Sequence, residues 1–291
     1  MRKILRWLGF LAVLAIVLAA SFVAFIYMTT EPLIRKTYVV PLTAIPVPTD
    51  PDSVAEGKRL ATIRGCFDGC HGPGIQGGLL YDVPWVTRLV APNLTQVAAS
   101  HSDAELERVI RHGVRQNGKS VWAMPSSMFH HLSDEDLGRI IAFLRSVQPS
   151  EGPATEARVG PLWRLELMQW QLGLKQEVYL PLAEEIRRDA PWIKEDIELA
   201  LRNRGRYLAV TICSECHGMK LHGDIEGSTP NLAIVAAYSE EDFFRLMKTA
   251  TPLGGRELGL MGMVARERFV HLTDDEVRAL YSYLFTLGEG V

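Results

Sequence analysis

Two short motifs hold all four cysteines of the chain, and each motif ends in a histidine followed by a glycine. The residues that could do chemistry are Cys66, Cys70 and His71 in the first motif and Cys213, Cys216 and His217 in the second. The second motif has the C-x-x-C-H spacing of c-type haem attachment, in which two thiols form thioethers with the haem and the imidazole ligates the iron. The first has one more residue between its cysteines. We therefore predict two covalently attached haem c groups.

Zinc, disulfide and dithiol redox chemistry use the same residue types. A zinc ribbon brings its cysteine pairs together over a spacer of about 15–20 residues, whereas well over a hundred residues separate these pairs. Zinc also gives no reason for a histidine directly after each pair, and two disulfides remain an alternative use of four thiols. A thioredoxin-like C-x-x-C site needs a surrounding βαβ pattern, which we do not find in the sequence.

The N-terminal segment predicts a membrane helix. Residues 7–28 are 22 positions without a charge, and a helix of that length spans about 33 Å, enough to cross a bilayer. Arg2, Lys3 and Arg6 precede this segment, and Glu31 is the first charge after it. The positive-inside bias then keeps the N-terminus in the cytoplasm and exports the rest of the chain.

A cleaved signal peptide is the alternative for the same segment. Residues 8–18 would be its apolar core, with a cut near Ala20 or Ser21. The apolar run continues through residues 22–26, where a polar cleavage region would be expected, so we favour an uncleaved anchor over residues 1–30. We therefore predict a protein of the bacterial inner membrane with a single N-terminal span and its haem domains in the periplasm.

The rest of the chain contains one module twice. In each copy a glycine lies ahead of the cysteine motif, a Pro-Asn-Leu triplet follows it, and a phenylalanine precedes an apolar segment. In chain order these features are Gly57, 92–94, Phe129 and 132–144 in the first copy and Gly205, 230–232, Phe269 and 272–284 in the second. The shared order indicates a duplication. We place two domains at residues 52–150 and 195–291, joined by a connection over residues 151–194.

Each copy predicts short helices and no convincing alternating strand. Ser133 and Thr273 are N-cap residues, and each is followed by acidic residues that the helix dipole favours. Further helical patterns cover residues 103–111, 137–144, 240–248 and 277–284. We predict a mainly α chain in which a haem fills the thin core of each small domain.

The connection contains three of the six tryptophans, Trp163, Trp170 and Trp192. Trp163, Leu167, Trp170 and Leu174 fall on one face of a predicted helix. We expect this face to pack against the two domains and to fix their relative orientation. A partner or a membrane surface is the alternative use of the same face.

Both copies resemble class I cytochrome c domains over nearly all of the two predicted domains. The residues that carry the resemblance are Gly57 and Gly205 in the first helix, Phe143 and Tyr283 in the last, and Pro92 and Pro230 after the cysteine motifs. The resemblance implies a contact between the first and last helices of each domain. It also implies that each proline carbonyl accepts a hydrogen bond from Nδ1 of the iron-ligating histidine, which orients the imidazole.

The resemblance further implies a methionine as the sixth iron ligand in each copy. In the first copy we predict Met124, which precedes a proline in what looks like the distal loop, while Met128 fits a gap filler of the core. In the second copy Met261 and Met263 both lie in the glycine-rich segment 259–264, ahead of what looks like the start of a helix. We predict Met261 because it has more reach towards an iron, and Met263 is the alternative.

The other histidines show no ligand pattern. His131 and His271 occupy the same repeat position, which suggests a common structural or solvated role. We expect the remaining four at the surface: His101, His112, His130 and His222. A histidine in place of the distal methionine would lower the reduction potential of that haem.

These features predict a membrane-anchored dihaem cytochrome c that relays electrons between a dehydrogenase or respiratory donor and an acceptor. An iron with both axial positions filled by protein cannot bind a substrate, so we expect an electron carrier rather than an enzyme. The formal net charge of −3 gives no reason to expect nucleic acid as a partner. A dihaem enzyme such as a peroxidase with one open haem site is the alternative. A haem-based sensor is a third possibility, for which we find no signalling domain in the sequence.

Overall fold

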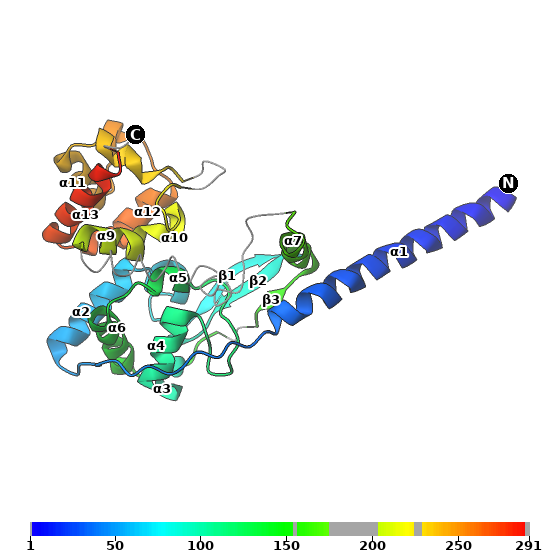
Figure 1. Cartoon of the computed structure of the whole chain (residues 1–291), viewed down its shortest axis with the longest axis horizontal. Helices are drawn as coiled ribbons and strands as arrows, with labels where there is room; N and C mark the ends of the chain where they lie inside the picture. The colour runs from blue at the N-terminus through cyan, green and yellow to red at the C-terminus, as the bar shows by residue number, and fades with distance from the viewer. Residues whose placement is uncertain (1, 154–155, 175–202, 224–228, 289–291) are drawn as a thin grey trace.

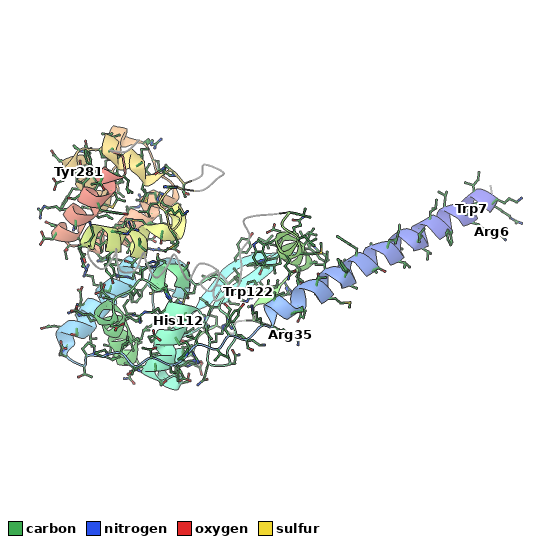
Figure 2. All side chains as sticks on the ribbon, in the orientation of Figure 1. Arg6, Trp7, Arg35, His112, Trp122 and Tyr281 are labelled. Atoms are coloured by element: carbon green, nitrogen blue, oxygen red, sulfur yellow. The ribbon has the colours of Figure 1, made fainter. Side chains whose placement is uncertain are left out.

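The computed structural model describes residues 2–153, 156–174, 203–223 and 229–288. A single long helix, α1 (Arg2–Ile34), projects from a body of short helices and one small sheet (Figure 1). By length and composition α1 could cross a membrane. Arg6 and Trp7 lie near its free end and Arg35 lies where it meets the body (Figure 2). Charged residues therefore flank the apolar stretch on both sides, as the sequence predicts.

The first copy of the repeat folds into five α-helices around a short irregular turn. Their bounds are α2 (Pro51–Ile63), α3 (Leu94–Ser100), α4 (Asp103–His112), α5 (Ser126–Phe129) and α6 (Asp134–Ser146). Helices α2 and α6 cross at Gly57, where an added Cβ would overlap the carbonyl oxygen of Arg139. Ser133 caps α6 by accepting a hydrogen bond from the backbone N–H of Asp136. The predicted contact between first and last helices is therefore confirmed in this copy.

The second copy repeats this plan. Its helices are α9 (Arg204–Leu208), η2 (Ala209–Cys213), α10 (Ser214–His217), η3 (Leu232–Ala237), α11 (Glu240–Thr249), η4 (Leu253–Gly255), α12 (Leu260–Glu267), η5 (Phe269–His271) and α13 (Asp274–Thr286). Helices α9 and α13 cross at Gly205, where an added Cβ would overlap the carbonyl oxygen of Ala279. Thr273 and Glu276 form a capping box at the start of α13. The predicted helix contact and N-cap are confirmed here too.

The chain also contains a small antiparallel sheet, which its sequence pattern does not predict. Strands β1 (Gly78–Val83) and β2 (Thr87–Ala91) form a hairpin between the first cysteine motif and Pro92, and β3 (Arg158–Val159) pairs with β2. The middle residues of β1 are all exposed, whichever way they point. The alternation that identifies a half-buried strand is therefore absent, and the expectation of no strand was wrong for this reason.

The connection contributes α7 (Pro161–Gln171), in which Trp163 and Leu167 are buried. Their partners in the described part of the chain are Leu33, Ile34, Val86, Leu89, Trp122, Val159 and Trp170. These belong to α1, to the first copy and to the connection itself, so the expectation that this face packs against both domains was wrong. Leu174 lies beyond the end of α7 and is exposed. Trp192 lies outside the described residues.

The two copies share one continuous hydrophobic core, and charged side chains lie where the copies meet. Arg59 of α2 contacts Glu276 of α13 at 2.8 Å and also donates a hydrogen bond to the carbonyl oxygen of His271. Arg64, just after α2, pairs with Asp136 at 3.1 Å, close to Tyr207 of the second copy. The interface therefore combines apolar burial with charged groups that specify one alignment of the two copies.

Candidate haem sites

Each motif histidine is buried and held by the same type of hydrogen bond. Nδ1 of His71 lies 2.8 Å from the carbonyl oxygen of Pro92, and Nδ1 of His217 lies 2.8 Å from that of Pro230. A carbonyl can only accept, so Nδ1 carries the proton in each ring and Nε2 keeps its lone pair. Within the described residues neither Nε2 has a hydrogen-bond partner. Burial also lowers the pKa of His71, which favours the neutral ring that binds metal.

The backbone after each histidine follows the same path in both copies. The N–H of Gly77 donates to the carbonyl oxygen of His71 at 2.9 Å, and the N–H of Gly223 donates to that of His217 at 2.9 Å. Ile75 and Leu221 occupy equivalent places, are buried, and both have a positive φ, 50° and 60° respectively. The duplication seen in the sequence therefore extends to the geometry of both loops.

The four cysteines are free of disulfide bonds. Burial raises the pKa of Cys66 and of Cys213 to about 12. Burial also raises the pKa of Cys70 and of Cys216. Zinc needs thiolates, which such surroundings disfavour, whereas a neutral thioether suits them. Within the described residues no group of three or more His, Cys, Asp or Glu side chains gathers to hold a metal ion.

The residues present therefore fit haem c in both copies. The first motif runs from Cys66 through the turn η1 (Phe67–His71), shortly after α2, and the second lies at the junction of η2 (Ala209–Cys213) with α10. In each case two thiols and a buried, oriented imidazole come from one short stretch of chain. A haem bound there supplies one-electron redox chemistry.

Met124 lies in the bend between Val121 and α5. It is half-buried and packs against the core, and its carbonyl oxygen accepts a hydrogen bond from the N–H of Ser126 at 2.8 Å. Met128 is only 1% exposed, as expected of a residue that fills the core. The two methionines therefore have different surroundings, and Met124 is the one at the edge of the core.

The second copy differs from the sequence expectation around its methionines. Met261 and Met263 lie in the first turns of α12, which begins at Leu260, and not in a loop. Gly262 is tolerated inside the helix because it is buried together with Ala265, so packing outweighs the low helix propensity of glycine. Met261 is half-buried and packs against the core, whereas Met263 is 40% exposed.

The other histidines do not behave as one class. His131 is fully buried with Nδ1 3.1 Å from the carbonyl oxygen of Ser127, whereas His271 is exposed, so the expected common role was wrong. His130 is half-buried, and its ring centroid lies 4.8 Å from that of His112 (Figure 2 labels His112 on α4). Burial lowers the pKa of His130 to about 4. No periodic pattern in the sequence predicts this pair, because His112 ends α4 and His130 caps the end of α5.

Comparisons with known proteins agree with this geometry. Residues 52–144 match the family described as cytochrome c oxidase, cbb3-type, subunit III, and residues 203–288 match the family described as cytochrome c. The chain contains two cytochrome c domains. The predicted mainly α architecture and the predicted pair of haem c groups are thereby confirmed. The apolar helix α1 fits a membrane anchor or a signal sequence by length and composition.

Relatives of the dihaem chain are found among dehydrogenase subunits. It is 24% identical to the fructose dehydrogenase cytochrome subunit of Gluconobacter japonicus, over 88% of this chain and 57% of that protein. It is 26% identical to the alcohol dehydrogenase (quinone) cytochrome c subunit of Gluconacetobacter polyoxogenes, over 84% of this chain and 58% of that protein. It is 26% identical to the gluconate 2-dehydrogenase cytochrome c subunit of Pantoea cypripedii, over 81% of this chain and 59% of that protein. The chain thus spans a little under three fifths of the length of these relatives.

The cysteine motifs of the two cytochrome c domains meet at the domain interface. Arg268, just after α12, pairs with Glu215 inside the second motif at 2.9 Å. The same guanidinium lies against the first motif: an added Cβ on Gly65 would overlap it, and one on Gly69 would lie 2.9 Å from its Nη2. Burial chiefly raises the pKa of Cys70, with Glu215 raising it further and Arg268 lowering it. Arg268 therefore stands between the motifs, and no pattern in the sequence pointed to it.

Proposed function

We propose that this chain is a membrane-anchored dihaem cytochrome c that relays electrons one at a time from a dehydrogenase or respiratory donor to an acceptor. Its relatives carry the names of cytochrome subunits of fructose, alcohol and gluconate dehydrogenases, which favours a dehydrogenase as the donor. The chain then consists of an anchor at 1–30, cytochrome c domains at 52–150 and 195–291, and a connection at 151–194.

The proposed haem ligands are the motif residues with one methionine in each domain. Thioethers to haem form at Cys66, Cys70, Cys213 and Cys216, the proximal ligands are His71 and His217, and the distal ligands are Met124 and Met261. The proline-bonded imidazoles support the proximal assignment. The half-buried positions of both methionines at the edge of the core support the distal one, with Met263 more exposed than Met261. Filled axial positions suit electron transfer rather than substrate binding.

The observation that carries the relay function is the meeting of the two cysteine motifs across Arg268. Electron transfer falls steeply with the distance between redox centres, so two haems in one chain exchange electrons rapidly only where their attachment sites lie close. The backbone of Gly65 and Gly69 on one side and Glu215 on the other both contact one guanidinium. An electron that arrives at one haem would therefore have a short path to the other.

The surroundings of α1 support an uncleaved anchor. The helix continues without a break from its apolar segment into residues that pack on α7 of the connection, and its Ile26 and Thr30 are buried. Glu31 pairs with Arg164 of α7 at 2.8 Å. We place this anchor in the bacterial inner membrane, with both cytochrome c domains in the periplasm.

The test uses the full chain produced in a bacterium that matures c-type cytochromes. We expect the intact mass to include two haems and the whole N-terminus, and the protein to fractionate with membranes. Redox dyes should reduce it in two separate one-electron steps. Steady peroxide reduction above ~1 s⁻¹ would contradict the relay and favour a peroxidase. A single retained haem would remove one site, and a soluble protein beginning near Phe22 would show that α1 is a signal peptide.

A further inference from the structure

Exposed apolar side chains surround the place where α1 joins the first cytochrome c domain. This apolar rim consists of Trp85, Leu162, Leu172 and Leu174, which are 74%, 50%, 63% and 76% exposed. Trp85 lies at the tip of the β1–β2 hairpin, and the leucines lie at the two ends of α7. The N–H of Leu162 donates to the carbonyl oxygen of Trp85 at 2.9 Å, so the hairpin tip and α7 form one unit.

Contacts with α1 fix the level of α7 along the membrane helix. The guanidinium of Arg164 lies 4.2 Å from the ring centroid of Tyr27, 3.1 Å from Oγ1 of Thr30 and 2.8 Å from Glu31. Tyr27 belongs to the uncharged stretch, and Glu31 is the first charge after it. Helix α7 therefore packs on α1 where that stretch ends, as Figure 1 shows.

The charge of Arg164 is compensated at this level. Its side chain is only 9% exposed: the guanidinium pairs with Glu31, donates a hydrogen bond to Thr30 and lies over the ring of Tyr27, while Nε has no hydrogen-bond partner among the described residues. An unpaired cation near a hydrocarbon boundary would oppose insertion, whereas a paired and hydrogen-bonded one does not. The inner face of α7 is filled by Trp163 and Leu167 against α1 and the sheet. The apolar rim lies outside this packed face and stays exposed.

We propose that the apolar rim inserts into the interfacial region of the periplasmic leaflet, beside the anchor. The inference rests on the proposed function only in taking α1 as that anchor. Tryptophan and tyrosine favour the boundary between headgroups and hydrocarbon, and exposed apolar side chains beside a membrane anchor gain free energy by leaving water there. The rim and α1 form two contacts with one bilayer. The first cytochrome c domain is then held against the membrane at a fixed height, facing any redox partner that is itself bound there.

The experiment places a nitroxide label at the rim of the full-length holoprotein in phospholipid vesicles. Trp85→Cys and Leu172→Cys each introduce one reactive thiol, because the native cysteines are bound in thioethers. Ile234→Cys is the matched control, since Ile234 is apolar, 45% exposed and in the second domain. We expect the ratio of label collisions with oxygen to those with a water-soluble nickel chelate to be severalfold higher at both rim positions than at 234. The ratio cancels any constant effect of the haem irons.

Two results of the collision measurement would contradict insertion of the rim. A ratio equal to that of the control at both rim positions overturns the proposal, because the rim is then in water. Few collisions with either reagent also overturn it, since a protein or a second copy then covers the rim. Intact mass of the same samples reports separately on the anchor. If α1 has been removed, vesicles are added to the soluble protein: a rise in the ratio at position 85 still supports the proposal, and no change overturns it.

Discussion

The hydroxyl of Tyr207 in the second cytochrome c domain donates a 2.6 Å hydrogen bond to Oδ2 of Asp136 in the first. The same carboxylate pairs with Arg64 at 3.1 Å, and all three side chains are buried. A buried charged pair is tolerated when its remaining polar atoms find partners, and removing one partner is costly. Tyr207 supplies such a partner from the opposite domain. This cluster thus makes the burial of Arg64 and Asp136 depend on how the two domains are docked.

Replacing Tyr207 by Phe should weaken the docking of the domains. Asp136 then loses a buried hydrogen bond, at a cost of about 1–3 kcal/mol in the free energy of unfolding. Calorimetry should show the unfolding transitions of the two domains moving apart. Tyr281→Phe is the control, because its hydroxyl bonds Tyr238 at 3.0 Å within the second domain (Figure 2 labels Tyr281). If the two unfolding transitions lie as close together in Tyr207→Phe as in wild type, Tyr207 does not have this role.

Replacing Arg268 by Ala should slow electron exchange between the haems. The guanidinium holds the cysteine motifs against each other through Glu215 and the backbone of Gly65 and Gly69. We expect normal spectra for each haem but a lower rate of internal transfer after flash reduction of one of them. Arg245→Ala is the control, since Arg245 pairs with Asp242 on the surface of its own helix and, among the described residues, contacts no part of the first domain by an ion pair. An unchanged internal rate would show that the interface aligns the haems without Arg268.

Replacing Met124 by Ala should open the sixth coordination position of the first haem. The expected result is a high-spin component in the absorption and electron paramagnetic resonance spectra, together with faster binding of added cyanide. Met128→Leu is the control: it keeps the volume of a buried side chain, should cost less than about 1.5 kcal/mol, and should leave the spectrum intact. An unchanged spectrum in Met124→Ala would refute the assignment.

The second haem is tested by Met261→Ala against Met263→Ala. Because Met261 packs against the core and Met263 is 40% exposed, only the first replacement should change the spin state. The structure puts both in α12, where the two side chains point to different sides of the helix. The opposite result would make Met263 the distal ligand.

Protonation of His130 should destabilise the first domain in mild acid. Burial lowers the pKa of His130 to about 4, whereas an unfolded histidine titrates near 6.5. Between these values the unfolded chain binds a proton that the folded chain does not, so stability is complete above about pH 6.5 and falls as the pH falls towards 4. The loss is up to about 3 kcal/mol. Urea unfolding at pH 7 and 4.5 measures it.

Two histidine variants test whether His130 controls the pH dependence of stability. His130→Asn removes the titrating ring while keeping a donor for the carbonyl of Arg111, and should reduce the change in stability between the two pH values. His222→Asn replaces an exposed histidine and should leave the change as in wild type. Identical pH dependence in both variants would show that His130 does not control it.

The chemistry of the haem sites was determined by the sequence itself. The two thiols and the imidazole that define each motif lie within six consecutive residues, so their presence and order need no tertiary structure. The caps at Ser133 and Thr273 are likewise local, because a side chain there bonds a backbone N–H three residues on. The bond from His71 to Pro92 followed from the family resemblance, and the geometry agrees with it.

Tertiary structure decided how these local units are combined. Arg268 reaches Gly65 across the domain interface, about two hundred positions away in the chain, and α7 packs on α1 instead of on the second domain. His131 is buried while its repeat counterpart His271 is exposed. Each outcome depends on which surfaces meet when the whole chain packs. Residue type and short spacing carry no information about partners so distant. Once the domains are docked, burial and charge pairing determine where Arg268, α7 and the two histidines lie.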